Sequence, residues 1–336
     1  MKKIAKKKNM PAQTGEFIKE NSLDEKYLHE LKDITYDPVF ILGLHRSGTS
    51  ILYKMLRSTG LFNTLTAYDV VYYNRLLYNF IQGKQEEYKK RFNNLILKTG
   101  KQKRDIDKIK MNADFAIEYS FLLGPPYLFQ QLKKDNIDVF DELCKKLQFV
   151  KEKEKPVLLK NPWDFPNFLF IKKHLPQAKF IFIHRHPLDM MNSSMNALRV
   201  IVNKQTVYSD IFSPFAKKID ENPLLYYFFK MLLYPEFPPG LPLVTEHRAG
   251  YVRSFLHDIS NLDTNSFVQI RYEDLCDNTT ETMGKIVDFL QLDSVDINTF
   301  SDFINPRNLT YSKDIQRMKR YIMDRFKPYC SVYNYQ

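Results

Sequence analysis

The sequence has little or nothing of several features that mark particular protein classes. Its cysteines are few, widely spaced and without a C-x-x-C pair: Cys144, Cys276 and Cys330. That pattern excludes a disulfide framework and a thiolate zinc site, and it fits a reducing compartment. No apolar run approaches the roughly 18 residues of a membrane-spanning helix, and no apolar segment follows the basic start to form a secretory signal. We therefore expect a cytoplasmic protein without a transmembrane segment.

The sequence also has no recognisable nucleic-acid-binding motif, although it is basic. Its formal net charge is +11 at pH 7. Part of this excess lies in residues 1–14, which we expect to be a disordered basic tail because they are polar and show no periodicity. The remaining charge mixes Lys with Glu, so small anionic substrates explain it better than nucleic acid does. Residues 15–336 are expected to form a single domain, with helical insertions at about 61–155 and 200–245.

The stretch at residues 38–50, Pro-Val-Phe-Ile-Leu-Gly-Leu-His-Arg-Ser-Gly-Thr-Ser, organises the rest of the chain. Its apolar start, residues 39–42, predicts a buried strand, and the segment from Thr49 predicts the start of a helix. Gly43 and Gly48 permit a tight turn and close approach of a ligand to the main chain. Consecutive N–H groups and the helix N-terminus then face one point, which favours binding of an anion such as phosphate. The alternative is an ordinary strand–helix turn with a surface arginine.

The loop lacks the lysine of the nucleotide-binding pattern G-x-x-x-x-G-K-[ST], because Thr49 takes that position. A nucleoside triphosphatase uses this lysine on the β- and γ-phosphates, so its absence argues against hydrolysis of ATP or GTP. Arg46 lies inside the loop instead. Its planar guanidinium is suited to bidentate contact with phosphate or sulfate oxygens, so the loop favours binding of an anion without triphosphate hydrolysis.

Further strands are predicted downstream of the loop at residues 157–160, 179–185 and 267–272. A helical pattern separates the first two of these strands, which predicts a parallel βαβ unit. Ligands bind at the carboxyl ends of the strands in such sheets, which brings Arg46, Lys160 and Arg185 to one edge. Ser193 follows Arg185 by eight residues on the next predicted helix, so the two side chains can converge on one phosphate.

The region between the loop and the second strand is expected to be mostly helical. Residues 113–132 predict a buried helix that is interrupted at residues 124–126, and residues 133–155 predict a charged, amphipathic helix. The tyrosine-rich stretch at residues 68–78 has two interpretations, a partly buried helix face or the wall of a site, and the sequence does not choose between them.

Four stretches, taken in order, resemble motifs of the sulfotransferases that use 3′-phosphoadenosine-5′-phosphosulfate (PAPS). They are the loop at residues 43–50, Leu-Leu-Lys-Asn-Pro at 158–162, Phe-Ile-Phe-Ile-His-Arg-His-Pro-Leu-Asp at 180–189 with Ser193, and Arg-Tyr-Glu-Asp-Leu at 271–275. The resemblance covers roughly residues 38–60 and 156–290. It is nearer to the carbohydrate and tyrosylprotein branch than to the small-phenol branch, because Arg46 stands where the small-phenol enzymes typically have a lysine.

The resemblance implies a three-layer α/β/α fold with a central parallel sheet, similar to that of the P-loop NTPases. It implies transfer of the sulfuryl group from PAPS to a hydroxyl or an amine, with adenosine 3′,5′-bisphosphate as product and no metal. By the same resemblance, the residues that bind the 5′-phosphosulfate are Arg46, Ser47, Gly48, Thr49 and Ser50. Arg185 and Ser193 would hold the 3′-phosphate, Lys313 is a further nucleotide contact, and Lys160 lies near the sulfuryl group.

The catalytic base is expected to be Asp69, the nearest carboxylate to the place where this branch often carries a glutamate. His45, Glu246 and His247 are the other candidates. We expect the acceptor to be a small molecule or a glycan, and the sequence leaves its identity open. Two other functions also stay open: a P-loop kinase-like nucleotide enzyme, and a non-catalytic nucleotide- or glycan-binding protein of the same fold.

Overall fold

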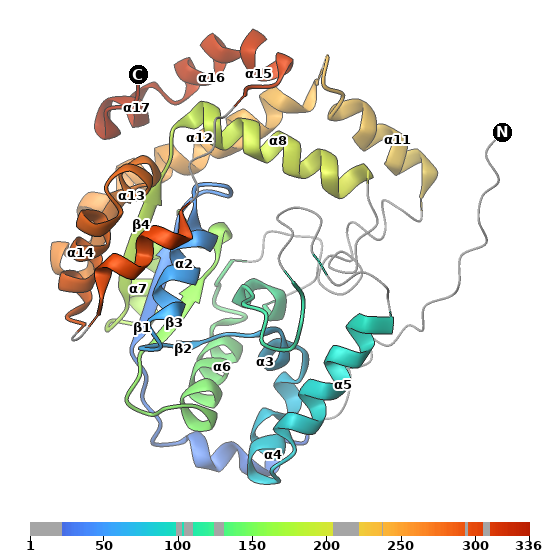
Figure 1. Cartoon of the computed structure of the whole chain (residues 1–336), viewed down its shortest axis with the longest axis vertical. Coiled ribbons are helices and arrows are strands. Elements are labelled where there is room, and N and C mark those ends of the chain that lie inside the picture. The colour runs from blue at the N-terminus through green and yellow to red at the C-terminus, as the bar shows by residue number, and fades with distance from the viewer. Residues whose placement is uncertain are drawn as a thin grey trace.

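The computed structural model describes residues 22–98, 103, 110–123, 131–203, 222–236, 238–292, 295–304 and 310–336. A five-stranded sheet runs through its centre (Figure 1). The strands are β1 Pro38–Leu42, β2 Asn63–Thr64, β3 Val157–Lys160, β4 Lys179–His184 and β5 Phe267–Arg271. The four longer strands confirm the sequence prediction, whereas the two-residue β2 was not predicted. The expected basic tail at 1–14 lies outside the described residues.

All pairs in the sheet are parallel, and the strand order is β2-β3-β1-β4-β5. The chain leaves β1 toward β2 and β3 on one side and later returns to place β4 on the other side. The carboxyl end of β1 is therefore the point where the strand order reverses. In open α/β sheets this is the position at which a crevice forms and ligands bind.

Side chains of the central strands alternate between two apolar layers. Phe40 and Phe182 belong to one buried cluster, and their neighbours Ile41 and Ile183 belong to the other. Strands buried on both faces need near-continuous apolar sequence, which is the pattern that made β1 and β4 predictable. Helices cover both faces, so the predicted three-layer α/β/α arrangement is confirmed.

The helices between β1 and β4 in the sequence are α2 Thr49–Ser58, α3 Ala67–Val71, α4 Leu76–Ile81, α5 Gln85–Lys98, α6 Ile137–Val150 and α7 Phe168–His174. The later helices are α8 Pro187–Asn203, α11 Pro223–Leu232, α12 Gly240–Asp258, α13 Tyr272–Asp277, α14 Thr279–Leu290, α15 Lys313–Arg317, α16 Lys319–Arg325 and α17 Lys327–Tyr333. Short 3-10 turns are η1 Glu25–Leu31, η2 Tyr73–Arg75, η3 Tyr119–Leu122, η4 Pro162–Asp164, η5 Ile259–Asn261, η6 Thr264–Ser266 and η7 Ile297–Phe303. Among the helices of the described residues, none has the length and apolar character needed to cross a bilayer.

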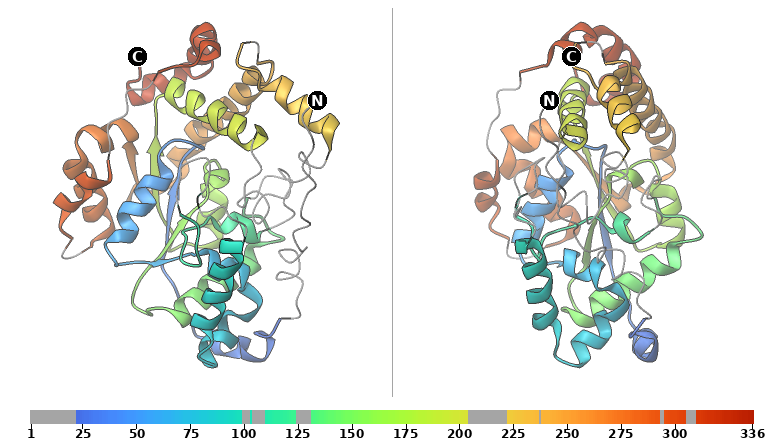
Figure 2. Two further views of the ribbon diagram at one scale, coloured as in Figure 1. Left: turned by 45° about the vertical axis from the view of Figure 1, so that its right-hand side comes forward. Right: turned by 90° about the vertical axis from the view of Figure 1, so that its right-hand side faces the viewer.

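Helices α8, α12 and α15–α17 gather at the carboxyl end of the sheet, and α3–α6 lie toward the opposite end (Figures 1 and 2). The last helix packs directly on the end of β4: the hydroxyl of Tyr329 accepts a hydrogen bond from the main-chain N–H of Arg185 at 3.2 Å. The ring of Tyr333 stacks on His184 with centroids 3.8 Å apart. The C-terminal segment therefore supports the edge where the predicted site residues lie.

The predicted helix at residues 113–132 is wrong over its described part. Residues 111–123 are irregular apart from the short η3 turn. Their main-chain groups bond instead to the segment around β2: Ala67 N–H donates to Phe115 O at 2.8 Å, and Tyr68 N–H donates to Ala113 O at 2.9 Å. These cross-chain bonds replace the i to i−4 bonds of a helix, because the apolar residues pack against α3. Residues 124–130 lie outside the described part.

The tyrosine-rich stretch is mainly core. Tyr68 and Tyr72 are 2% and 3% exposed and belong to the larger apolar cluster. Of the two interpretations left open by the sequence, the buried helix face therefore describes these two residues.

Candidate active site

The loop between β1 and α2 depends on two glycines. A Cβ at Gly43 would lie 2.5 Å from the carbonyl oxygen of Ile183, on the neighbouring strand β4. Gly48 has a φ of +104°, and a Cβ there would lie 2.3 Å from the ring of Tyr272. Any side chain at either position therefore collides with the structure, and Gly48 also has a backbone conformation that L-residues rarely adopt. Between them Arg46 takes a positive φ of 74°.

Two arginines from distant parts of the chain bind the carbonyl groups of this loop. Arg185, just after β4, donates to the carbonyl oxygen of Arg46 at 2.9 Å. Arg248, on α12, donates to the carbonyl oxygen of His45 at 2.8 Å. Together they hold the loop in its unusual conformation from two sides.

The loop offers main-chain donors at the start of α2. Within the described residues, the N–H groups of Gly48, Thr49 and Ser50 make no main-chain hydrogen bond, as expected for the first turn of a helix. Gly48 is the N-cap residue and supplies no side-chain cap. Unpaired N–H groups and the positive end of the helix dipole together favour an anion at this point.

Arg46 and Ser193 are brought together across the site. Arg46 Nε donates to Ser193 Oγ at 2.9 Å. Since Arg185 also bonds to Arg46, the three residues predicted at the two phosphates form one group, which we call the loop cluster: Arg46, Arg185 and Ser193. The sequence-predicted residues of β1, β4 and α8 therefore meet at the carboxyl edge of the sheet.

The motif at residues 271–275 supports the loop cluster from the start of α13, directly after β5. The guanidinium of Arg185 lies over the ring of Tyr272, 4.3 Å from its centroid. Glu273 accepts a hydrogen bond from the main-chain N–H of His186 at 2.8 Å. The tyrosine thus fixes the direction of Arg185, and the glutamate fixes the main chain that carries it.

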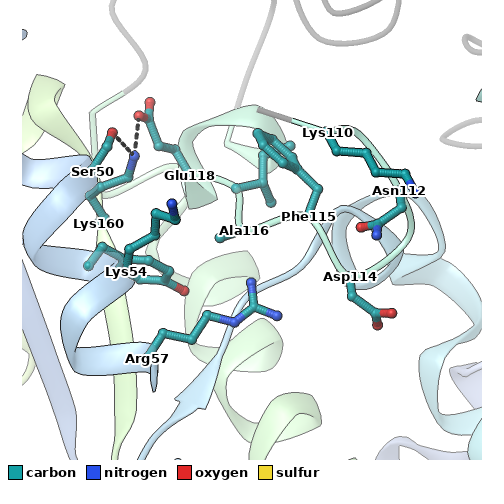
Figure 3. Close-up of a pocket in the computed structure, with 12 residues that line it drawn as sticks. Ser50, Lys54, Arg57, Lys110, Asn112, Asp114, Phe115, Ala116, Glu118 and Lys160 are labelled. Atoms are coloured by element: carbon teal, nitrogen blue, oxygen red, sulfur yellow. Dashed lines mark hydrogen bonds and ion pairs between the residues drawn. The ribbon is translucent and has the colours of Figure 1, made fainter. Parts of the chain in front are cut away.

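Lys160, at the end of β3, lies between a hydroxyl and a carboxylate (Figure 3). Its ammonium donates to Ser50 Oγ at 3.0 Å and forms an ion pair with Glu118 Oε1, also at 3.0 Å. The side chain of Lys160 is 8% exposed and that of Glu118 is 20% exposed. A cation and a carboxylate therefore lie together beside the first turn of α2.

His45 is held in its neutral form. Burial is the main cause that lowers its pKa well below the usual value, and the cations of Arg248, Lys160 and Arg46 lower it further. Its ring meets Trp163 edge-on at 4.3 Å between centroids. Arg248 is itself affected, because burial and the charge of Arg46 lower its pKa to about 10. Burial thus disfavours the charged form of both side chains.

Asp69 has the contacts of a helix cap. Its Oδ2 accepts from the main-chain N–H and the hydroxyl of Thr66, both at 2.8 Å, and pairs with Lys151 Nζ at 2.8 Å. This is a capping box at the start of α3. Its role as catalytic base stays a prediction, and these contacts favour a structural role.

The remaining predicted site residues are Glu246, His247 and Lys313. Glu246 accepts from Tyr321 and Arg325 at 2.7 and 2.6 Å on a partly exposed surface, and burial and Arg248 lower the pKa of His247. Lys313 is exposed at the start of α15. The residue before it, Ser312, donates to Asn192 at 3.1 Å, so this segment reaches the residue next to Ser193.

Sequence reasoning missed two side chains of the site. Glu118 lies in a segment that reads as helix, and only the ion pair with Lys160 reveals it. Arg248 lies within a helical pattern, and its position depends on the approach of α12 to the loop. No local motif marks either residue. The available signal for Glu118 was a carboxylate in an otherwise largely apolar stretch shortly before the break at residues 124–126.

Comparison with known proteins now adds a decisive observation. The sequence profile of the sulfotransferase family matches residues 38–227, more than half of the chain. The chain belongs to the sulfotransferase family. A search of curated proteins gives no match.

Two solved structures are similar to this sulfotransferase. The sulfotransferase STF9 from Mycobacterium avium has a TM-score of 0.63 and 14% identity, and the match covers 96% of this chain and 82% of that one. The sulfotransferase STF1 from Mycobacterium tuberculosis H37Rv has a TM-score of 0.56 and 16% identity, with 90% and 79% covered. At these identities the likeness concerns the fold, which agrees with the predicted α/β class. Sulfuryl transfer is the reaction class that family membership supports.

Proposed function

We propose that this sulfotransferase takes its sulfuryl group from PAPS and transfers it to a hydroxyl group of a small-molecule or glycan acceptor. The observation that carries the proposal is the loop cluster. Arg46, Arg185 and Ser193 come from three separate parts of the chain, and Arg46 is hydrogen-bonded to both of the others: its side chain to Ser193 and its carbonyl oxygen to Arg185. Two arginines at one edge of the sheet suit a ligand with two anionic groups, and a nucleotide with phosphates at both the 3′ and 5′ positions supplies one for each.

In this proposal the loop binds the 5′-phosphosulfate. The N–H groups from Gly48 to Ser50 meet its oxygens, with Arg46 and the buried Ser47 beside them. Arg185 and Ser193 take the 3′-phosphate, and Tyr272 keeps Arg185 in place. Lys313 starts a segment tied to α8 and remains a further contact of the nucleotide.

The transfer step needs a base for the acceptor and a cation for the leaving group. The acceptor oxygen attacks sulfur, the bond from sulfur to the bridging oxygen of the phosphate breaks, and its electron pair stays on that oxygen. The acceptor proton passes to a carboxylate. The products are the sulfated acceptor and adenosine 3′,5′-bisphosphate. Positioning and electrostatic stabilisation supply most of the catalysis in the related phosphoryl transfers.

Glu118 fits the role of base better than Asp69. Its carboxylate contacts Lys160, whose ammonium also contacts the first turn of α2, where the sulfuryl group would lie. Lys160 would stabilise the charge that develops on the bridging oxygen, and Glu118 would accept the acceptor proton next to it. Asp69 Oδ2 is already surrounded by three donors.

Calorimetric titration with adenosine 3′,5′-bisphosphate tests the donor assignment. Arg46→Ala and Arg185→Ala should each weaken binding by roughly 10- to 150-fold, because each removes charge-assisted hydrogen bonds. Arg91→Ala is the matched control, since Arg91 lies exposed on α5 and pairs with Glu87. Unchanged affinity in both site variants contradicts the assignment.

A thermal-shift comparison separates PAPS use from the kinase-like alternative. Adenosine 3′,5′-bisphosphate should raise the melting temperature of the wild-type protein more than ATP with Mg²⁺ at equal concentration. Position 49 of the loop is a threonine, so the loop has no lysine at that position to hold a γ-phosphate. A larger shift with ATP and Mg²⁺ would favour the kinase-like enzyme.

A further inference from the structure

A cavity of about 200 Å³ opens on the side of α2 that faces residues 110–118 (Figure 3). Ser50, Glu118 and Lys160 line it, so it begins at the proposed reacting centre. The volume is below the usual range for pockets that take drug-sized ligands. An acceptor that fills it is therefore small.

The floor of this cavity is one face of α2. Ser50, Lys54 and Arg57 are spaced by four and three residues, which places them in a row on the helix surface. A rise of about 1.5 Å per residue separates Ser50 from Lys54 by about 6 Å and from Arg57 by about 10 Å. Figure 3 shows both cationic side chains extending from α2 toward the opposite wall. Two cationic side chains thus extend from the helix face that also carries Ser50, at the proposed reacting centre.

The opposite wall is held in place by the main chain. Ala113 N–H donates to Asn93 Oδ1 at 2.7 Å, and Ile117 N–H donates to Leu65 O at 3.3 Å. Together with the bonds from α3 to Ala113 and Phe115, they fix both ends of the wall. The cavity is therefore a formed feature of the described residues.

Charges in the cavity are unbalanced. It is lined by four cationic side chains, Lys54, Arg57, Lys110 and Lys160, and by two carboxylates, Asp114 and Glu118. Both carboxylates already have cationic partners: Asp114 pairs with Lys89 at 3.1 Å, and Glu118 pairs with Lys160. Within the described residues, Lys54 and Arg57 form no ion pair. Lys54 and Arg57, on the α2 face of the cavity, are thus left for a ligand.

We infer that the acceptor of this sulfotransferase is a small anionic molecule. Its hydroxyl group lies at Glu118 and Lys160, and its carboxylate, phosphate or sulfate group lies at Lys54 and Arg57. This inference rests on the proposed function for the position of the reacting hydroxyl. The anion site itself rests on the cavity and its charges alone.

Matched pairs of compounds test the inference on the full-length protein saturated with adenosine 3′,5′-bisphosphate. The pairs are glucose with glucuronate, glucose with glucose 6-phosphate, and phenol with 4-hydroxyphenylacetate, and binding is measured by calorimetry or by saturation-transfer NMR. The anionic member of at least one pair should bind about tenfold more tightly than its neutral partner. Raising NaCl from about 0.05 to 0.5 M should weaken only the anionic members, because exposed charges are screened.

Two variants assign the effect to the cavity. Lys54→Ala with Arg57→Ala should reduce the preference for the anion about tenfold, while affinity for adenosine 3′,5′-bisphosphate stays within twofold. Lys285→Ala is the control, because Lys285 lies 60% exposed on α14. Equal affinity for the members of every pair, or an unchanged preference in the double variant, overturns the inference. Repeating the titrations without nucleotide separates it from the donor assignment: anion binding that persists while the nucleotide fails to bind contradicts only the PAPS proposal.

Discussion

The two parts of helix α2 meet different surroundings. At its N-terminus Ser47 and Thr49 are buried, and distant arginines bind the loop carbonyls. One and two turns further on, Lys54 is exposed and Arg57 is half-buried, without an ion pair among the described residues. A site that holds one ligand in one geometry binds more tightly when its groups are buried and hydrogen-bonded to one another, because binding then requires little reorganisation. A site for a variable acceptor needs only a fixed wall and a few exposed charges.

The largest effect is expected from removing the carboxylate of Glu118, which lies between the N-terminus of α2 and the cavity. Glu118→Gln should lower kcat roughly 10²- to 10⁴-fold, since a general base is lost. Asp69→Asn is the matched variant and should mainly lower the melting temperature, because it disrupts the capping box and removes the carboxylate that pairs with Lys151. Steady-state rates with labelled PAPS and affinity for adenosine 3′,5′-bisphosphate are measured for both.

The result that reverses the roles is equally clear. Should Asp69→Asn lose activity while keeping its stability, and Glu118→Gln keep its activity, the base is Asp69 as the sequence predicts.

The buried N-terminus of α2 should tolerate no added atom. Gly48→Ala places a methyl group on the ring of Tyr272 at a φ of +104°. The backbone conformation alone costs about 1–3 kcal/mol, and the displaced loop should lose its affinity for adenosine 3′,5′-bisphosphate. Gly60→Ala is the control, because Gly60 also has a positive φ, of 72°, but no atom lies within 4 Å of its added Cβ. Gly60→Ala should lower stability and leave nucleotide affinity unchanged. Equal nucleotide affinity in both variants would show that close packing at Gly48 does not matter.

The grouping of residues at the proposed nucleotide site could largely be predicted from the sequence, for a physical reason. Strands β1, β3 and β4 are buried on both faces, so they appear as short apolar runs, and parallel strands deliver their end residues to one edge. Arg46, Lys160 and Arg185 could therefore be grouped before any coordinates were known. Ser193 followed from its spacing to Arg185.

The cavity proposed for the acceptor could not be predicted from the sequence, because its wall has no periodic pattern. Residues 111–123 contain enough apolar residues to suggest a helix, but their main-chain groups bond to α3 and to the segment before it. The position of Glu118 in the site is evident only from its ion pair with Lys160, which lies 42 residues later in the sequence. Arg248 likewise reaches the loop only because α12 packs near it in the folded protein. Spacing in the sequence carries information about neighbours within one element, and these contacts join different elements.

Burial of His184, at the end of β4, should make the stability of the protein depend on pH. Burial lowers the pKa of His184 to about 3 from an ordinary 6.5. Between these values the unfolded chain binds the proton and the folded chain does not, so the free energy of unfolding falls as pH decreases. From pH 6.5 to 5 the loss should be about 2 kcal/mol. Chemical denaturation of the wild type and of His184→Gln measures it.

The variant should flatten this part of the pH profile. His257→Gln serves as control, because the His257 side chain is 83% exposed. Identical slopes for wild type and His184→Gln contradict the account of a neutral, buried imidazole under the site.

The smallest expected effect concerns Arg248, which supports the loop without facing the nucleotide in the proposal. Arg248→Gln removes the charge behind His45, and the loop carbonyl loses its donor. Affinity for adenosine 3′,5′-bisphosphate should fall by about tenfold, as for loss of one charge-assisted hydrogen bond. Arg253→Gln, one turn further along α12 and 55% exposed, is the control. A loss as large as that of Arg185→Ala would instead indicate direct contact with the ligand.

The most direct test of the central claim is a thermodynamic cycle at the loop cluster. Calorimetry compares adenosine 3′,5′-bisphosphate with 5′-AMP, which lacks the 3′-phosphate, in wild type, Arg185→Ala and Ser193→Ala. The wild type should prefer the bisphosphate strongly, and this preference should fall at least tenfold in Arg185→Ala and less in Ser193→Ala. Affinity for 5′-AMP should fall by about tenfold in Arg185→Ala, which also removes the donor to the loop carbonyl of Arg46, and should stay nearly unchanged in Ser193→Ala. A preference that is absent in the wild type, or is the same in all three proteins, would contradict the claim that Arg185 and Ser193 hold the 3′-phosphate.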